Sequence, residues 1–299
     1  MKSLTKKQKN LQAVFIFVTG FIISCALLAV AAKYDLEINH KLYNPTHLLA
    51  MFAEFFGFWP LYLPAALFGF SLAANVTYKP VVRWLGRLLI VLTFGGLFYA
   101  AVHYAQKRNV LVSFTPLYAI LLSLAVSAAL CALPLLVRID ISVAIRLRFM
   151  GLFGLCYMAA DNIVINIIKM IVGRARYDDM LLADGFESFS MWYKIGGTGG
   201  TSLPSGHTAA ATGILLLLLL CSLFKSCEGE EKNWAFVAYA YITLVAIGRI
   251  MMGRHFLSDT VIATVIMSVV FFLMTHNAVY DKALQKALAQ AQKVNPSPK

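Results

Sequence analysis

The fold of this chain is decided by residues 151–176, which read GLFGLCYMAADNIVINIIKMIVGRAR. The segment is apolar over a length that lets a helix cross a bilayer, for which about 20 residues suffice. Asn162, Asn166 and Lys169 follow i, i+4, i+7 spacing and therefore share one face of that helix. Hydrogen bonds to neighbouring helices account for the two asparagines. Lys169 instead forms a cationic cluster with Arg174 and Arg176 at the helix end, which indicates an anionic ligand.

The composition of the 299-residue chain is that of a membrane protein. Hydrophobic residues make up 60% and charged residues 13%, and the mean hydropathy is +0.74. The formal net charge of +12 does not indicate a nucleic-acid partner, because Lys and Arg occupy short segments between hydrophobic stretches. The five cysteines show no spacing typical of a metal site or a disulfide framework. We predict a single integral membrane domain over residues 1–299.

Runs of spanning length predict an all-α, polytopic transmembrane helix bundle of about eight spans. We read the first run as an uncleaved helix rather than a signal peptide, because it is long enough to cross the bilayer. The eight runs lie near 12–32, 57–74, 88–105, 115–136, 149–171, 208–224, 234–250 and 259–275.

Basic loops alternate along the chain and predict its orientation, because positive charges stay on the cytoplasmic side. The basic or mixed-charge segments are the N-terminus, 75–87, 138–148, 225–233 and the polar tail 276–299. Both termini are therefore predicted to be cytoplasmic. The connections 172–207 and 251–258 then fall together on the extracytoplasmic face.

The connection 172–207 mixes aromatic and charged residues between 180 and 193, a composition typical of the headgroup layer. It is predicted to lie on the membrane surface, either as an aromatic belt or as a lid that grips a lipid. The glycine-rich stretch 196–200 lacks the spacing and the lysine of a phosphate-binding loop, so we interpret it as a flexible joint.

Two histidines stand beside these connections. His207 ends the stretch Pro204-Ser205-Gly206-His207, which could either cap the next helix or turn backbone N–H groups towards an anion. His255 precedes Asp259 by four residues, so on a helix the carboxylate could reach one ring nitrogen and orient the imidazole. A structural His–Asp pair would explain the same spacing. The predicted topology nevertheless brings both histidines to one membrane face.

Cations on that same face predict phosphoryl transfer. Lys169, Arg176 and Arg249 would neutralise the oxyanions, while one histidine attacks phosphorus and the other protonates the leaving oxygen.

Three spaced motifs carry a resemblance to a known family. They are KMIVGRAR at 169–176, PSGH at 204–207 and RIMMGRHFLSD at 249–259. In their order and spacing they resemble the signature of the type-2 phosphatidic acid phosphatase superfamily, over a core of about 149–275. Tyr177 stands where the family usually has Pro, and Gly248 where it usually has Ser. The family's six-helix core also implies two extra N-terminal helices here.

The resemblance implies a role for each site residue. His255 would be the nucleophile that forms a phosphohistidine, Asp259 its orienting partner and His207 the general acid. The phosphate-binding residues would be Lys169, Arg176, Ser205, Gly206 and Arg249. Neither a metal nor another cofactor is implied.

The expected function is therefore removal of phosphate from a phosphorylated membrane lipid at the extracytoplasmic face. A bacterial inner-membrane enzyme acting from the periplasm on lipid A or undecaprenyl diphosphate fits this expectation. There are two alternatives. One is a lipid phosphotransferase with the same site, and the other is an anion or lipid transporter that uses the cluster only for binding.

Overall fold

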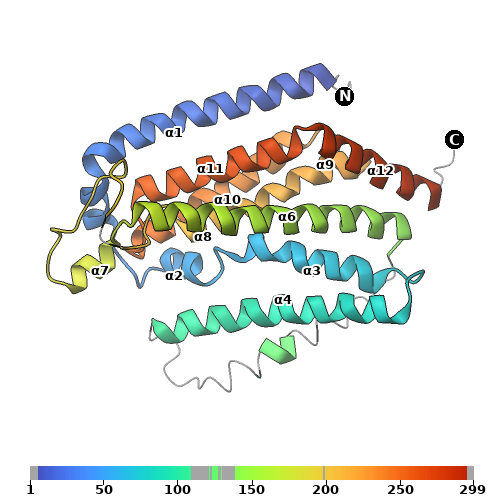
Figure 1. Cartoon of the computed structure of the whole chain (residues 1–299), viewed down its shortest axis with the longest axis horizontal. Helices are drawn as coiled ribbons and strands as arrows, with labels where there is room; N and C mark the ends of the chain where they lie inside the picture. The colour runs from blue at the N-terminus through green and yellow to red at the C-terminus, as the bar shows by residue number, and fades with distance from the viewer. Residues whose placement is uncertain are drawn as a thin grey trace. The chain divides into compact units, whose positions relative to one another are not determined.

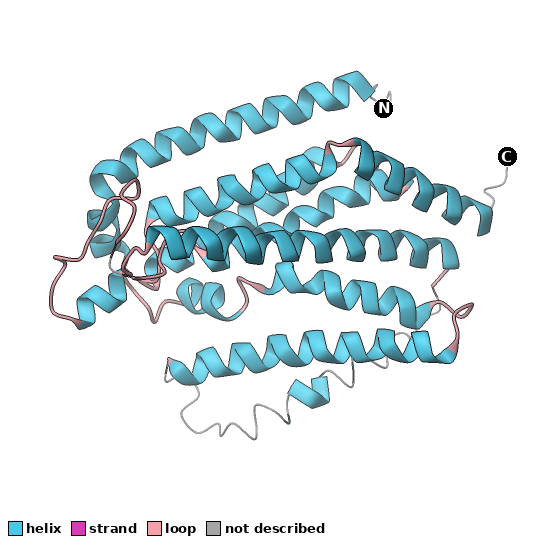
Figure 2. Cartoon of the chain, viewed as in Figure 1, coloured by secondary structure: helices cyan, strands magenta, loops and turns pink. Residues whose placement is uncertain are grey.

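The computed structural model describes residues 6–108, 121, 123–126, 129, 139–197 and 199–294. Within these ranges all regular structure is helical, with no strand, as Figure 2 shows. This confirms the predicted all-α class. The helices labelled in Figure 1 are α1 (Lys6–Leu42), α2 (Leu48–Phe55), α3 (Trp59–Ala74), α4 (Pro80–Lys107), α6 (Ile141–Val172), α7 (Tyr177–Leu182), α8 (Gly206–Ala211), α9 (Leu219–Leu223), α10 (Glu231–Met251), α11 (Leu257–Thr275) and α12 (Ala278–Val294), with 3₁₀ segments η1 (Thr212–Leu218) and η2 (Lys225–Cys227).

Five helical segments in the described part are long and apolar enough to cross a membrane. They are α4, α6, the run Gly206–Leu223 formed by α8, η1 and α9, α10, and α11. The pair α2 and α3, joined by a short break, makes a sixth candidate. Five of the predicted spans correspond to the first group, and 57–74 overlaps the α2–α3 pair. The chain is thus an all-helical protein with five or six candidate spans among the residues described.

Two predicted spans have a different outcome. The run 12–32 lies inside the 37-residue helix α1, which continues to Leu42. The run 115–136 falls mostly outside the described residues. The count of eight spans and the cytoplasmic position of the termini therefore remain predictions.

Contacts between residues divide the chain into two compact units. Unit 1 consists of Met1–Phe58 and Asp161–Val269, and unit 2 of Trp59–Ala160 and Val270–Lys299. In unit 2, α3 packs against α4 where two glycines meet, since a Cβ on Gly69 would lie 2.6 Å from the carbonyl oxygen of Gly86. In unit 1, α10 packs against α2, α8 and η1. The single domain over 1–299 and its core at 149–275 remain predictions.

Helix ends in unit 1 follow from local chemistry, and they determine where the motif residues lie. Gly173 has φ 62°, a left-handed conformation that favours glycine, and it follows the last residue of α6. Ser205 is the N-cap of α8, and its hydroxyl oxygen accepts a hydrogen bond from the Thr208 N–H at 3.3 Å. Gly253, with φ 74°, turns the chain between α10 and α11. Each motif therefore lies at a helix terminus.

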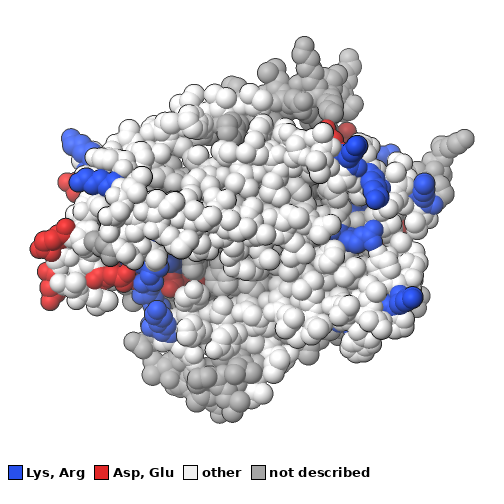
Figure 3. All heavy atoms as spheres, viewed as in Figure 1, with Lys and Arg blue, Asp and Glu red and all other residues white. Residues whose placement is uncertain are grey.

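The segment between α6 and α8 carries four acidic residues after the arginines at its start. Figure 3 shows acidic side chains gathered over α7 and the loop after it, where the sequence has Asp178, Asp179, Asp184 and Glu187. On the face shown, the flanks of α6 and α11 carry few charged side chains among the residues described. This contrast is typical of helices that face lipid and a connection that faces water.

Candidate active site

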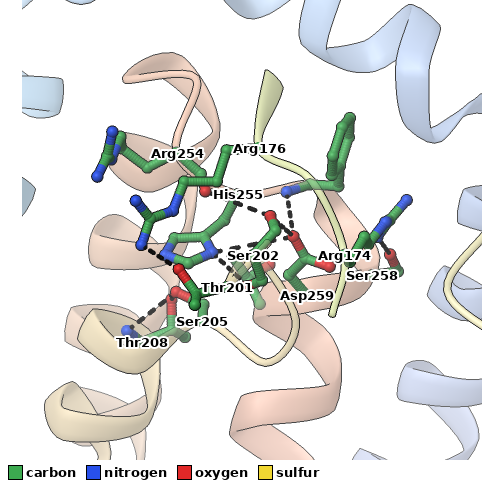
Figure 4. Close-up of polar contacts among 12 residues, drawn as sticks. Arg174, Arg176, Thr201, Ser202, Ser205, Thr208, Arg254, His255, Ser258 and Asp259 are labelled. Atoms are coloured by element: carbon green, nitrogen blue, oxygen red, sulfur yellow. Dashed lines mark hydrogen bonds and ion pairs between the residues drawn. The ribbon is translucent and has the colours of Figure 1, made fainter. Parts of the chain in front are cut away.

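All eight predicted site residues belong to unit 1. They lie at or next to the ends of α6, α8, α10 and α11, and Figure 4 shows part of the resulting cluster. The predicted residues are Lys169, Arg176, Ser205, Gly206, His207, Arg249, His255 and Asp259.

His255 is held in one tautomer by a backbone group. Its side chain is buried, and its Nδ1 atom lies 2.7 Å from the carbonyl oxygen of Ser202. A carbonyl oxygen only accepts, so Nδ1 carries the hydrogen and Nε2 keeps its lone pair when the ring is neutral. Burial lowers the pKa of His255 well below its usual value, and the nearby cations Arg249 and Lys169 lower it further. The imidazole is therefore neutral at pH 7, the form that can attack an electrophile.

Asp259 does not form the direct hydrogen bond to His255 that the spacing predicts. Its Oδ2 atom lies 3.9 Å from Nδ1 of His255, beyond hydrogen-bonding distance. The same oxygen accepts hydrogen bonds from the Ser202 hydroxyl at 2.6 Å and the Phe256 N–H at 2.8 Å. The i, i+4 argument fails because α11 begins only at Leu257, so His255 lies outside the helix. Asp259 instead fixes the Ser202 segment, whose carbonyl orients His255.

Arg174 is a fully buried cation that sequence reasoning assigned only to the general cationic cluster. Its guanidinium donates hydrogen bonds to Asp259 at 2.6 Å and to Asp35 at 2.9 Å. Further bonds reach the Ser258 hydroxyl at 2.8 Å and the Ser190 carbonyl at 2.9 Å. A buried charge is stable only when it is paired and hydrogen-bonded, and Arg174 meets that condition within the protein. Arg174 therefore anchors the site, and Asp35 is a site-supporting residue that the sequence did not reveal.

Lys169 reaches the start of α8. A Cβ atom on Gly206 would lie 3.0 Å from the Lys169 Nζ atom, so the ammonium group lies against the first residue of that helix. Ser205, by contrast, uses its hydroxyl locally, in contacts with the Thr208 N–H and with the Thr208 hydroxyl at 2.9 Å. The structure thus shows the capping function of Ser205, while its contact with phosphate remains a prediction.

Arg176 lies at the exposed side of the cluster. It donates a hydrogen bond to the Thr201 hydroxyl at 2.6 Å, which joins the segment after α6 to the segment before α8. Arg254, next to the candidate nucleophile, pairs with Asp178 of α7 at 2.9 Å. The Arg176–Thr201 bond joins two parts of the connection 172–207 (Figure 4), and the Arg254–Asp178 pair attaches that connection to the turn that carries His255.

Glu54 of α2 contacts two of the predicted residues. Its carboxylate forms an ion pair with Arg249, and both side chains are only 3% exposed. Its carbonyl oxygen lies 3.2 Å from Nε2 of His207, whose ring also packs edge-on against Phe58. Sequence reasoning missed Glu54 because 195 residues separate it from Arg249, and a single Glu in an apolar run was the only signal.

The described residues include no group of three or more His, Cys, Asp or Glu placed to hold a metal ion. The predicted residues bring two imidazoles together with guanidinium and ammonium groups in the same unit. That the reaction needs no metal remains a prediction.

The three motifs lie together in unit 1, and a comparison with known protein families shows which family they resemble. Residues 151–283 match the model of the PAP2 superfamily. This part of the chain is similar to the PAP2 superfamily. Searches of curated proteins and of solved structures gave no match. The PAP2 match supports phosphatase activity on a phosphorylated substrate, and it covers all eight predicted site residues.

Residues from outside the PAP2 match complete the site. Asp35 on α1 and Glu54 on α2 each place a carboxylate on a buried arginine. Both lie more than 90 residues before the matched segment begins at residue 151. The N-terminal part of the chain therefore contributes directly to the surroundings of the PAP2 motifs.

Gly248, a departure from the PAP2 pattern, has a packing reason. A Cβ atom at this position would lie 2.5 Å from the Cβ of Ala53 and 2.5 Å from the carbonyl oxygen of Leu49. The usual serine would therefore push α2 away from α10. Glycine allows the close approach that brings Glu54 to Arg249.

Tyr177, the other departure, joins the connection to α1. Its side chain is buried, and its hydroxyl lies 2.9 Å from Nδ1 of His40. Its ring packs against those of Tyr43, Phe186 and Phe256. Tyr177 thus attaches the residues after Arg176 to the end of α1, in place of the rigid turn that a proline would provide.

Proposed function

We propose that this chain is a metal-independent lipid phosphatase that works through a phosphohistidine at the extracytoplasmic membrane face. The observation that supports it most directly is the hydrogen bond from Nδ1 of His255 to the Ser202 carbonyl, which leaves Nε2 with a lone pair. Lys169, Arg176 and Arg249 supply positive charge in the same unit, as a phosphate group requires.

In the first step, Nε2 of His255 attacks phosphorus, and the bond between phosphorus and the leaving oxygen breaks. That oxygen is the ester oxygen of a lipid monophosphate or the bridging oxygen of a lipid diphosphate. Protonated His207 gives its proton to it, so the lipid alcohol leaves in the first case and the lipid monophosphate in the second. The imidazole gains positive charge as the N–P bond forms. Asp259, 3.9 Å from Nδ1, stabilises that charge without taking the proton.

In the second step, water attacks the phosphohistidine, and the neutral His207 accepts a proton from it. The N–P bond breaks, orthophosphate is released, and both histidines return to their starting states. The phosphate-binding residues would be Lys169, Arg176 and Arg249, together with Ser205 and the Gly206 amide at the start of α8.

Exposed apolar side chains near the site support a lipid substrate. Leu182 at the end of α7 is 84% exposed and Ile195 is 72% exposed, and Leu181 and Tyr193 are also exposed. Such side chains on a connection between apolar helices fit insertion into the headgroup layer. We therefore propose a bacterial envelope lipid, such as lipid A or undecaprenyl diphosphate, as the substrate.

The test is phosphate release by protein purified in detergent with a chelator present. A panel of lipid A, prenyl diphosphate and phosphatidate identifies the lipid, and ³²P-labelled substrate reveals an acid-labile phosphoprotein. We expect His255→Ala to lose both signals, while His103→Ala, which changes an exposed histidine of α4, keeps both. Phosphate release that survives in His255→Ala would overturn the mechanism.

A further inference from the structure

Glu54 is the most unusual feature of the site, because a carboxylate lies where an anionic substrate is expected to bind. It comes from α2, outside the matched segment, and no motif includes it. Its side chain pairs with Arg249 and its carbonyl oxygen contacts His207. One residue thus contacts both a proposed phosphate-binding group and the proposed general acid.

The position of Glu54 is set by close helix packing. Gly248 lets α2 approach α10, because a Cβ atom at this position would overlap Ala53 and Leu49. Gly57, just after α2, allows a second close approach, because a Cβ there would lie 2.9 Å from a methyl group of Val245. Close contacts with α10 therefore flank Glu54 in the sequence, at Leu49 and Ala53 before it and at Gly57 after it, and they fix its position.

Arg249 retains hydrogen-bonding capacity while it is paired. Glu54 receives the hydrogen bond of Nη1, whereas the buried Nε has no hydrogen-bond partner among the residues described. A buried donor without a partner is costly, so Nε would be stabilised by an acceptor that reaches it. A phosphate oxygen could bind at Nε while Glu54 stays on Nη1, so Arg249 would bridge the carboxylate and the phosphate.

We propose that Glu54 is a positioning residue that remains on Arg249 and weakens the binding of phosphate. The carboxylate and the bound phosphate are like charges separated by one guanidinium group, and their repulsion lowers the affinity of the site for orthophosphate. Release of the product is thereby favoured. This inference rests on the proposed function, in which Arg249 holds the phosphate.

The experiment compares inhibition by orthophosphate in wild type and Glu54→Gln. Glutamine keeps an oxygen acceptor for Nη1 and removes the charge. We expect the inhibition constant for orthophosphate to fall about tenfold and kcat to fall with it as release slows, because the repulsion between two charges is removed. Loss of a merely structural contact would weaken phosphate binding instead.

Glu37→Gln is the matched control, because it removes the charge of an exposed carboxylate on α1 in the same unit. We expect its inhibition constant to equal that of wild type. Glu54→Met, uncharged and of similar length, has the same expected sign and covers the case in which the glutamine variant does not fold.

The two possible failures differ. An active wild type whose Glu54→Gln variant binds orthophosphate equally or more weakly would overturn this inference alone. A wild type that neither releases phosphate from lipids nor binds orthophosphate would contradict the proposed function as well.

Discussion

The Nδ1 atom of His255 donates a hydrogen bond to the carbonyl oxygen of Ser202 over 2.7 Å. The hydroxyl of the same serine donates to Asp259 over 2.6 Å. Ser202 therefore stands between the candidate nucleophile and the carboxylate predicted to orient it. Asp259 thus holds the segment whose carbonyl oxygen binds His255.

Ser202→Ala tests this connection. The substitution keeps the carbonyl that binds His255 and removes the hydroxyl that binds Asp259. We expect kcat/KM to fall about tenfold with little change in KM, since one hydrogen bond to a charged group is worth about 1.5–3 kcal/mol. Phosphate release by the purified variant measures this. An unchanged kcat would show that the serine hydroxyl does not help to position His255.

The buried Arg174 is expected to affect stability more than catalysis. Arg174→Met removes a cation paired with Asp35 and Asp259 and leaves two buried carboxylates without it. Breaking a buried pair costs about 3–5 kcal/mol, so thermal unfolding in detergent should begin at a markedly lower temperature. Arg254→Met, whose ion pair with Asp178 is partly exposed, serves as the comparison. Its cost should be smaller, because the Arg254 side chain is 17% exposed and keeps some contact with water, and equal losses in the two variants would contradict this interpretation.

The pH dependence should reflect the lowered pKa of His255. In the proposed mechanism the histidine must be neutral to attack phosphorus. Burial is the larger cause that lowers its pKa well below 6.5, and the nearby cations lower it further. Neutral His255 therefore persists as the pH falls through 6.5, and it is lost only at the lower pKa of the folded protein. We expect the acid limb of kcat/KM, which reports the free enzyme, to lie below pH 6.5. An acid limb centred above that pH would contradict the prediction.

Gly248→Ser places the family's usual residue into this chain. Because its Cβ would meet Ala53 and Leu49 at 2.5 Å, α2 must shift and Glu54 must move away from Arg249. Overpacking of this kind costs about 1–3 kcal/mol, so both stability and activity should fall. Gly96→Ser on α4 is the control, because a Cβ there meets nothing within 4 Å. A fully stable and active Gly248→Ser would show that α2 tolerates displacement.

Much of the helical framework could be predicted from local sequence. Apolar runs such as 234–250 and 259–275 correspond closely to α10 and α11, because a chain in lipid must satisfy its backbone hydrogen bonds within each helix. The apolar run 12–32 predicted a helix but not its continuation to Leu42. The residues after Lys33 are mostly polar or charged, so hydrophobicity gives no signal there. Spans are thus predicted better than helix ends.

The motif residues could likewise be predicted, because the spacing of Lys169, Arg176, His207, Arg249 and His255 is local information. Their partners could not be. Asp35 pairs with Arg174 across 139 positions and Glu54 with Arg249 across 195, and no periodicity links such distant residues. Sequence also overestimated the direct His255–Asp259 contact, which needed both residues to lie on one helix.

Sequence alone therefore indicates the class of fold and the groups that could act on a phosphate, because hydrophobicity and charge are properties of each residue. Tertiary structure alone decides which carboxylate neutralises each buried arginine and which carbonyl fixes each histidine. The physical reason is that a buried charge or imidazole takes whichever polar group the packing brings within about 3 Å. That choice depends on how closely helices such as α2 and α10 approach each other, which here requires that Gly248 has no side chain.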